Sequence, residues 1–139
     1  MATTKKPYVR MHKDIRNRVD HKVAPVEYTV DAKGRTLGRV ASEAAQALQG
    51  KKSVHFVRNK VLPVKVTIVN ASKLSLPEKR VDQKAYTRYT GYPGGLKHFT
   101  LKDVVKKTGM KGLLTKTVDG MIPRNKLRKE RMKRLIIVD

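Results

Sequence analysis

Apolar and polar residues alternate in the first patterned stretch of the chain, where Glu27 and Thr29 separate Val26, Tyr28 and Val30. A period of two residues is typical of a strand that buries one face. The glycine-containing sequence DAKGR follows this stretch directly and favours a turn. The sequence therefore predicts a strand that ends in a turn at residues 31–35.

The next apolar residues recur three and four positions apart, which is the period of a helix. They are Leu37, Val40, Ala41, Ala44 and Leu48. Thr36 is suited to cap the beginning of this helix, and Gly50 is suited to end it. The strand, the turn and the helix together form a β-turn-α unit.

A run of β-branched residues from Val64 to Ala71 predicts a second, buried strand, and Pro63 is tolerated at its beginning. Because a helix separates the two strands, we expect them to pair in parallel. Shorter apolar patterns at 101–105 and 113–118 predict two short helices, and 134–138 predicts a last strand. The expected fold is α/β, with helices on a small, mostly parallel sheet.

No internal repeat or low-complexity linker divides the sequence. We expect residues 23–139 to form a single domain, preceded by a basic N-terminal arm, residues 1–22. This arm lacks the apolar stretch of a secretory signal, and we expect it to face nucleic acid.

The net charge of the chain indicates the chemical class of its partner. The 139 residues include 33 Lys and Arg against 11 Asp and Glu, a net charge of +22. A free domain with this charge repels itself, and a polyanion removes the repulsion. Nucleic acid is favoured over a membrane surface, because no long face rich in Trp, Leu and Phe accompanies the cations. The aliphatic run Leu135–Val138 is far shorter than a membrane span.

Catalytic and metal chemistry find little support. The absence of cysteine excludes disulfides, cysteine zinc sites and thiol catalysis. The four histidines lack metal-ligand spacing, and the carboxylates show no catalytic motif. Asp31 is interpreted as a turn or capping residue. We expect no enzymatic activity, no metal and no cofactor.

The sequence GRTLGR places glycines between a strand and a helix, where free backbone N–H groups can bind phosphate. It matches neither the Walker pattern nor the dinucleotide fingerprint. Lys33, Arg35 and Arg39 stand at the positive end of the helix dipole, which is unfavourable unless an anion is present. An RNA phosphate is one candidate anion, and plain solvation is the alternative for at least one of the three side chains.

The sequence AYTRYTGYPGGLKHF, residues 85–99, holds three of the five tyrosines within seven residues. A buried strand would have apolar neighbours, whereas these tyrosines are interleaved with cations. We expect the rings to stack on RNA, the cations to hold its backbone and the glycines to allow close approach. The expected RNA-binding residues here are Lys84, Tyr86, Arg88, Tyr89, Tyr92, Gly94, Gly95 and Lys97.

A helix is expected after Pro123, with cations around its whole circumference and only Leu127, Met132 and Leu135 to bury. It is either a solvated charge run or a helix wedged among phosphates. The expected RNA-binding residues here are Arg124, Asn125, Lys126, Arg128, Lys129, Arg131, Lys133 and Arg134. Between the first helix and the second strand they are Lys51, Lys52, Arg58 and Lys60.

Four segments, VDAKGRTLGRVASEAAQALQGKK, VNASK, YTRYTGYPGGLK and GMIPRNKL, occur in the order and spacing of a known family. From about Tyr28 to Val138 the chain resembles the large-subunit ribosomal protein family L-thirteen in its bacterial and organellar form. The resemblance implies a three-layer α/β/α domain that binds large-subunit rRNA, joins the particle early in assembly and has no catalytic activity. It also implies neighbouring large-subunit proteins as partners, no homo-oligomer, and a cytoplasmic rather than an organellar ribosome.

Two other functions are compatible with the residues. A free RNA-binding translational regulator would use the same basic surface outside the ribosome. A small enzyme with a phosphate-bearing ligand would use the GRTLGR turn.

Overall fold

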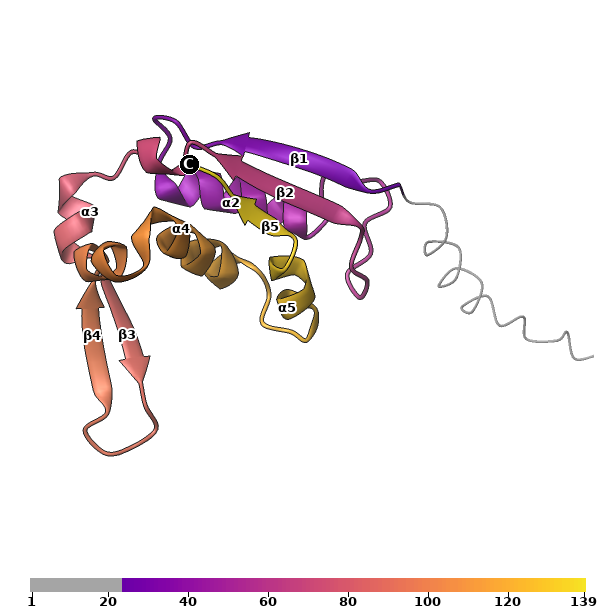
Figure 1. Ribbon diagram of the computed structural model, residues 1–139. Coiled ribbons are helices and arrows are strands. Elements are labelled where there is room, and N and C mark those ends of the chain that lie inside the picture. The colour runs from indigo at the N-terminus through magenta and orange to yellow at the C-terminus, as the bar shows by residue number, and fades with distance from the viewer. Residues whose placement is uncertain (1–23) are drawn as a thin grey trace, which may run out of the picture.

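The structure is a computed structural model, and it describes residues 24–139 (Figure 1). The expected N-terminal arm, residues 1–22, lies outside the described residues. In chain order the elements are β1 (Val26–Asp31), α2 (Leu37–Leu48), β2 (Val64–Val69), the 3-10 helix η1 (Ala71–Lys73), α3 (Glu78–Gln83), β3 (Ala85–Tyr89), β4 (Leu96–Thr100), α4 (Leu101–Met121), α5 (Leu127–Met132) and β5 (Leu135–Ile137).

Strands β1, β2 and β5 form a parallel sheet in the order β1-β2-β5. The two predicted parallel strands pair from Val26 with Val64 to Asp31 with Val69. The last strand, β5, is also confirmed, and it pairs with β2 from Val66 to Ile68. The α/β class and the small parallel sheet are therefore confirmed.

The core lies between one face of this sheet and the helices α2 and α4. Val30, Val66 and Ile68 point into it from the strands, and Val40 and Leu114 meet them from the helices. All five side chains are at most 2% exposed. Burial of this kind is the main stabilising contribution in a domain of this size.

The other face of the sheet carries exposed residues, among them Glu27, Thr29, Asp31 and Lys65. The strand order advances in one direction, so right-handed crossovers place both connecting helices on the same face. Within residues 24–139 no helix covers the opposite face. The described part thus has one helical layer where the family resemblance implied two.

Both ends of α2 fall where the sequence placed them. Thr36 occupies the N-cap position, but its side chain makes no capping hydrogen bond. The helix ends at Leu48, and Gly50 follows with a φ of +80°. A side chain at this glycine would be strained and would collide with Leu62. Gly50 therefore ends the helix and also makes room for the next strand's approach.

Helix α4 joins the two short helices predicted at 101–105 and 113–118. Gly109 interrupts it with a φ of +69° and a ψ of −176°, which are not helical values. The first part begins in a capping box, in which Thr100 and Asp103 exchange hydrogen bonds. The second part carries the buried Leu113, Leu114 and Val118.

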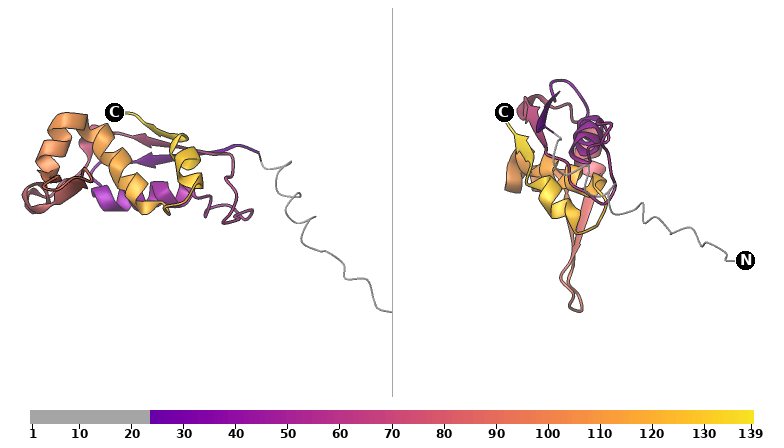
Figure 2. Two further views of the ribbon diagram at one scale, coloured as in Figure 1. Left: turned by 90° about the horizontal axis from the view of Figure 1, so that it is seen from below. Right: turned by 90° about the vertical axis from the view of Figure 1, so that its right-hand side faces the viewer.

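Helix α3 and the antiparallel hairpin β3-β4 lie apart from the sheet. Figure 1 and the right-hand view of Figure 2 show the hairpin extending away from the rest of the described chain. The sequence pattern predicts the turn but neither α3 nor the paired strands. In both elements most residues are exposed, so they have no apolar period that would reveal them.

Candidate nucleic-acid interface

The hairpin pairs its residues so that two cations stand directly opposite each other. Arg88 pairs with Lys97, and both side chains are exposed. Like charges in directly opposed positions destabilise a strand pair. An anion between Arg88 and Lys97 would remove this repulsion, so the register favours a phosphate on this face.

The opposite face and the tip of the hairpin expose aromatic rings. Tyr89 is 62% exposed and Tyr92 is 75% exposed. Tyr89 stands opposite Leu96, which is itself 55% exposed. Neither ring belongs to the core, and both are available for stacking.

The two tip glycines have different roles. Gly94 has a φ of +71° and open space around its Cα. A side chain at Gly95 would collide with the side chain of Thr90, whose backbone N–H donates to the Gly95 carbonyl over 3.2 Å. Close approach by RNA is therefore possible at Gly94, whereas Gly95 is required by the packing of the loop.

Tyr86 differs from the other two tyrosines because it is half-buried at the base of the hairpin. The Lys116 Nζ lies 4.2 Å from the centroid of its ring, and the Lys84 Nζ lies 5.8 Å away. Cation–π contacts of this kind favour a fixed ring. Lys116 on α4 is not among the residues that the sequence predicts, because only the fold brings it to Tyr86.

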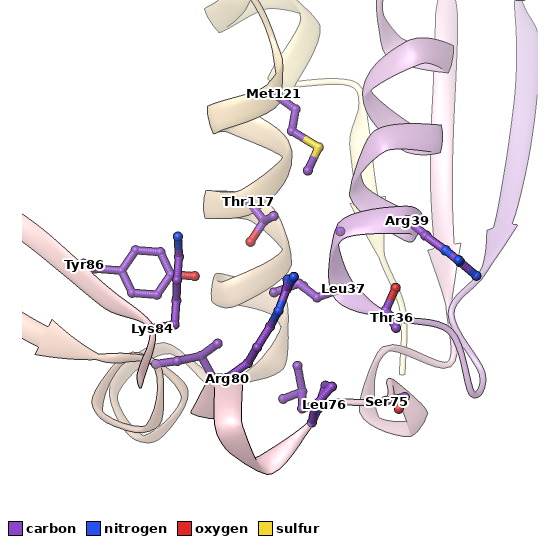
Figure 3. Close-up of a pocket in the computed structure, with 13 residues that line it drawn as sticks. Thr36, Leu37, Arg39, Ser75, Leu76, Arg80, Lys84, Tyr86, Thr117 and Met121 are labelled. Carbon is purple, nitrogen blue, oxygen red and sulfur yellow. The ribbon is translucent and has the colours of Figure 1, made fainter. Parts of the chain in front are cut away.

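A hollow of about 530 Å³ opens between the beginning of α2, helix α3 and helix α4. Arg39, Arg80 and Lys84 contribute cations to its lining, and Tyr86 contributes a ring. Figure 3 shows Arg80 reaching toward Leu37 between the helices, Lys84 beside the ring of Tyr86, and Arg39 extending away from both. Arg80 is not among the residues that the sequence predicts, because the pattern does not reveal α3 itself.

Replacing Arg80 with alanine is expected to remove one phosphate contact. The slope of log affinity against log salt should fall by about 0.7–0.9, with weaker binding of rRNA at low salt. Lys79→Ala is the matched control, since Lys79 is exposed on the same helix but does not line the hollow. Filter binding of both variants at several salt concentrations checks this. Equal losses of rRNA affinity in the two variants would show that the hollow contributes no more than any other exposed cation.

Of the three cations expected around the beginning of α2, Arg35 is ion-paired within the chain. The Arg35 guanidinium lies 2.7 Å from Glu43, and the Lys52 Nζ lies 3.1 Å from the same carboxylate. These hydrogen bonds, that from Arg35 foremost, hold the pKa of Glu43 below its ordinary value. Lys33 and Arg39 are exposed and remain available to an anion.

Two aspartates have lowered pKa values for a related reason. Asp31 accepts a hydrogen bond from the backbone N–H of Lys33 at 3.0 Å, which confirms it as a turn residue. This bond and then the bond from the Asn70 amide lower the pKa of Asp31. The pKa of Asp103 is lowered by the side chain and then by the backbone of Thr100. Each carboxylate is hydrogen-bonded in its charged form.

Because the pKa values of these carboxylates are lowered by folding, we expect the free energy of unfolding to fall in acid. A pKa that is lower in the folded state contributes stability above the unfolded value near 4 and loses it as the pH falls through the folded value. Urea unfolding at pH 7, 4.5 and 3.5 should show a falling free energy of unfolding. Glu43→Gln should reduce stability at pH 7 by less than about 1 kcal/mol and flatten the decline. An identical pH profile in this variant would show that Glu43 has no part in it.

The C-terminal cations divide into internal and exposed groups. Arg131 is only 3% exposed, and Arg134 is half-buried and donates to the Leu62 carbonyl. Arg128 is paired with Asp119. The expectation of RNA contact is wrong for Arg131, because a phosphate cannot reach it. The exposed members of the group are Arg124, Asn125, Lys126, Lys129 and Lys133.

The loop between α2 and β2 also presents cations. Lys51, Lys52 and Arg58 are exposed, whereas Lys60 is half-buried. Within residues 24–139, His, Asp and Glu form no group of three or more that could hold a metal ion. No helix in this same range is both long and apolar enough to cross a membrane.

The sequence model of the family described as "Ribosomal protein L13" matches residues 26–139. This chain belongs to the ribosomal protein L13 family. The L13 match includes the sheet, the hairpin, the hollow and the C-terminal cations, so all the features above lie in the family domain.

Curated L13 relatives agree with this membership. "Large ribosomal subunit protein uL13" of Clostridioides difficile is 44% identical over 108 residues, which cover 78% of this chain and 75% of the relative. The protein of the same name from Thermus thermophilus is 39% identical over 117 residues, 84% of this chain and 83% of the relative.

Proposed function

We propose that this chain is a structural constituent of the large ribosomal subunit that binds large-subunit rRNA and has no catalytic role. Residues 23–139 act as its single domain, and neighbouring large-subunit proteins are further partners. The observation that carries the proposal is the hairpin, which exposes a directly opposed Arg88 and Lys97 on one face and tyrosines on the other face and at the tip. Rings and unpaired cations on one projecting element suit RNA, which offers bases and phosphates together.

Two further observations support this function. The net charge of +22 favours a polyanionic partner. The two relatives are named as large-subunit proteins and come from bacteria, which favours a cytoplasmic ribosome. Binding that relieves charge repulsion also favours an early place in assembly, when most rRNA is still accessible.

Sedimentation of a lysate tests the proposal. The chain should sediment with large subunits at moderate salt and in part remain bound after a high-salt wash. A free translational regulator uses the same surface, but most of it would stay near the top of the gradient. Absence of the chain from the large-subunit fractions at moderate salt would overturn the ribosomal function.

A further inference from the structure

The loop 51–62 is tied to the domain near its two ends, where Lys52 pairs with Glu43 and Leu62 is buried in the core. It contains no helix or strand, and its backbone hydrogen bonds are local ones, such as Phe56 N–H to the Ser53 carbonyl at 3.3 Å. Local bonds shape turns but do not fix a loop to the body of a domain. Yet this loop carries the exposed Lys51 and Arg58, whose direction decides whether they can meet RNA.

Two arginines near the C-terminus add a long-range attachment through the backbone of the loop. Arg131 donates from Nη2 to the carbonyls of Arg58 at 3.4 Å and Lys60 at 3.3 Å. Arg134 donates from Nη1 to the carbonyl of Leu62. Three alternate carbonyls of the loop are thus held by residues more than 70 positions later in the chain.

The burial of Arg131 argues that this attachment is its role. A buried charge is costly, and no carboxylate is among the hydrogen-bond partners described for its guanidinium. Its Nε atom is buried without a hydrogen-bond partner. A residue needed only to fill space would be apolar. The guanidinium Nη2 carries two hydrogens at the end of a long side chain, which lets this one atom hold both carbonyls.

We propose that Arg131 and Arg134 are positioning residues that fix the loop 51–62 and thereby present Lys51 and Arg58 to RNA. This inference rests on the proposed RNA-binding function. Arg131 is too buried to touch phosphate, so it acts through the loop. The C-terminal arginines therefore serve two purposes: some face outward to RNA, and these two hold another RNA-facing segment in place.

Hydrogen exchange in the free, full-length protein tests the attachment. Arg131→Lys keeps the charge, but its shorter side chain ends before the position of Nη2 and leaves the two carbonyls out of reach. It should speed exchange of the loop amides about tenfold or more while α2 stays protected. Arg134→Met, which removes a bond from a less buried site, should show a smaller effect at the same amides. Unchanged loop exchange in both variants would overturn the inference.

Binding to an rRNA fragment tests the consequence through a double-mutant cycle. Arg131→Lys should weaken binding about fivefold or more in the natural loop, but less than about twofold when Lys51→Ala and Arg58→Ala are already present. The matched control, Arg124→Met, removes an exposed charge and should weaken binding equally in both backgrounds.

The cycle also separates the alternatives. Equal weakening by Arg131→Lys in both backgrounds would mean a direct or a global role and would overturn the inference. Normal affinity of the Lys51→Ala and Arg58→Ala double variant would overturn it too, because the loop would not contact RNA. The proposed ribosomal function would survive that result, since it rests on the hairpin and on sedimentation.

Discussion

Raising the salt concentration from about 50 to about 200 mM should weaken binding of this chain to an rRNA fragment about a hundredfold or more. Each phosphate that a cation neutralises releases counterion, with a slope of about 0.7–0.9 in log affinity against log salt. About five contacts are enough for this loss. The structure offers more exposed cations than that, among them Lys51, Arg58, Arg80, Lys84, Arg88, Lys97, Lys126, Lys129 and Lys133.

The same titration contains its own control. Tyr89→Ala removes an aromatic ring but no charge, so it should lower the affinity at every salt concentration and leave the slope unchanged. Arg88→Ala should reduce the slope. A slope near zero for the natural protein would contradict the electrostatic account, whatever the affinity.

Burial explains why part of this fold could be predicted from sequence. The strands β1 and β2 and the helix α2 bury apolar side chains at a regular period, and the period is what the sequence displays. The hairpin and α3 bury almost nothing, so no period marks them. The two short patterns that form α4 were visible, but Gly109 alone does not reveal whether it separates two helices or bends one.

The residues of the candidate site likewise divide into those that the sequence predicts and those that only the fold reveals. Exposed cations and the tyrosine-rich turn could be proposed as RNA-binding from composition and spacing. The structural role of Arg131 could not be predicted, because a count of charges treats every arginine as exposed. Its hydrogen-bond partners are main-chain carbonyls distant in the sequence, which no local pattern reveals. Arg80 and Lys116 were missed for the converse reason: their importance comes from the hollow and the ring beside them, which exist only in the folded chain.

Tyr89→Ala is expected to weaken rRNA binding by about 1–3 kcal/mol, the range for a lost stack on a base. Because the ring is 62% exposed, its removal leaves no cavity, and thermal unfolding of the free protein should be nearly unchanged. Tyr89→Phe is the control, since it keeps the stacking face and loses only the hydroxyl. A loss of stability as large as the loss of affinity would show that the ring supports the hairpin instead.

Two substitutions at Gly94 distinguish the effect of the backbone conformation of the tip from the effect of close RNA approach. Gly94→Val should weaken rRNA binding by about 1–3 kcal/mol, as Tyr89→Ala does. A β-branched residue rarely adopts a φ of +71°, so the backbone of the tip must change its path. Gly94→Asn is the matched control: asparagine tolerates this conformation, and the surrounding space is open. If only the path matters, the asparagine variant binds nearly normally; if RNA approaches the backbone closely, both variants fail. Normal affinity of the valine variant would mean that the tip touches no RNA, because neither substitution alters a charge.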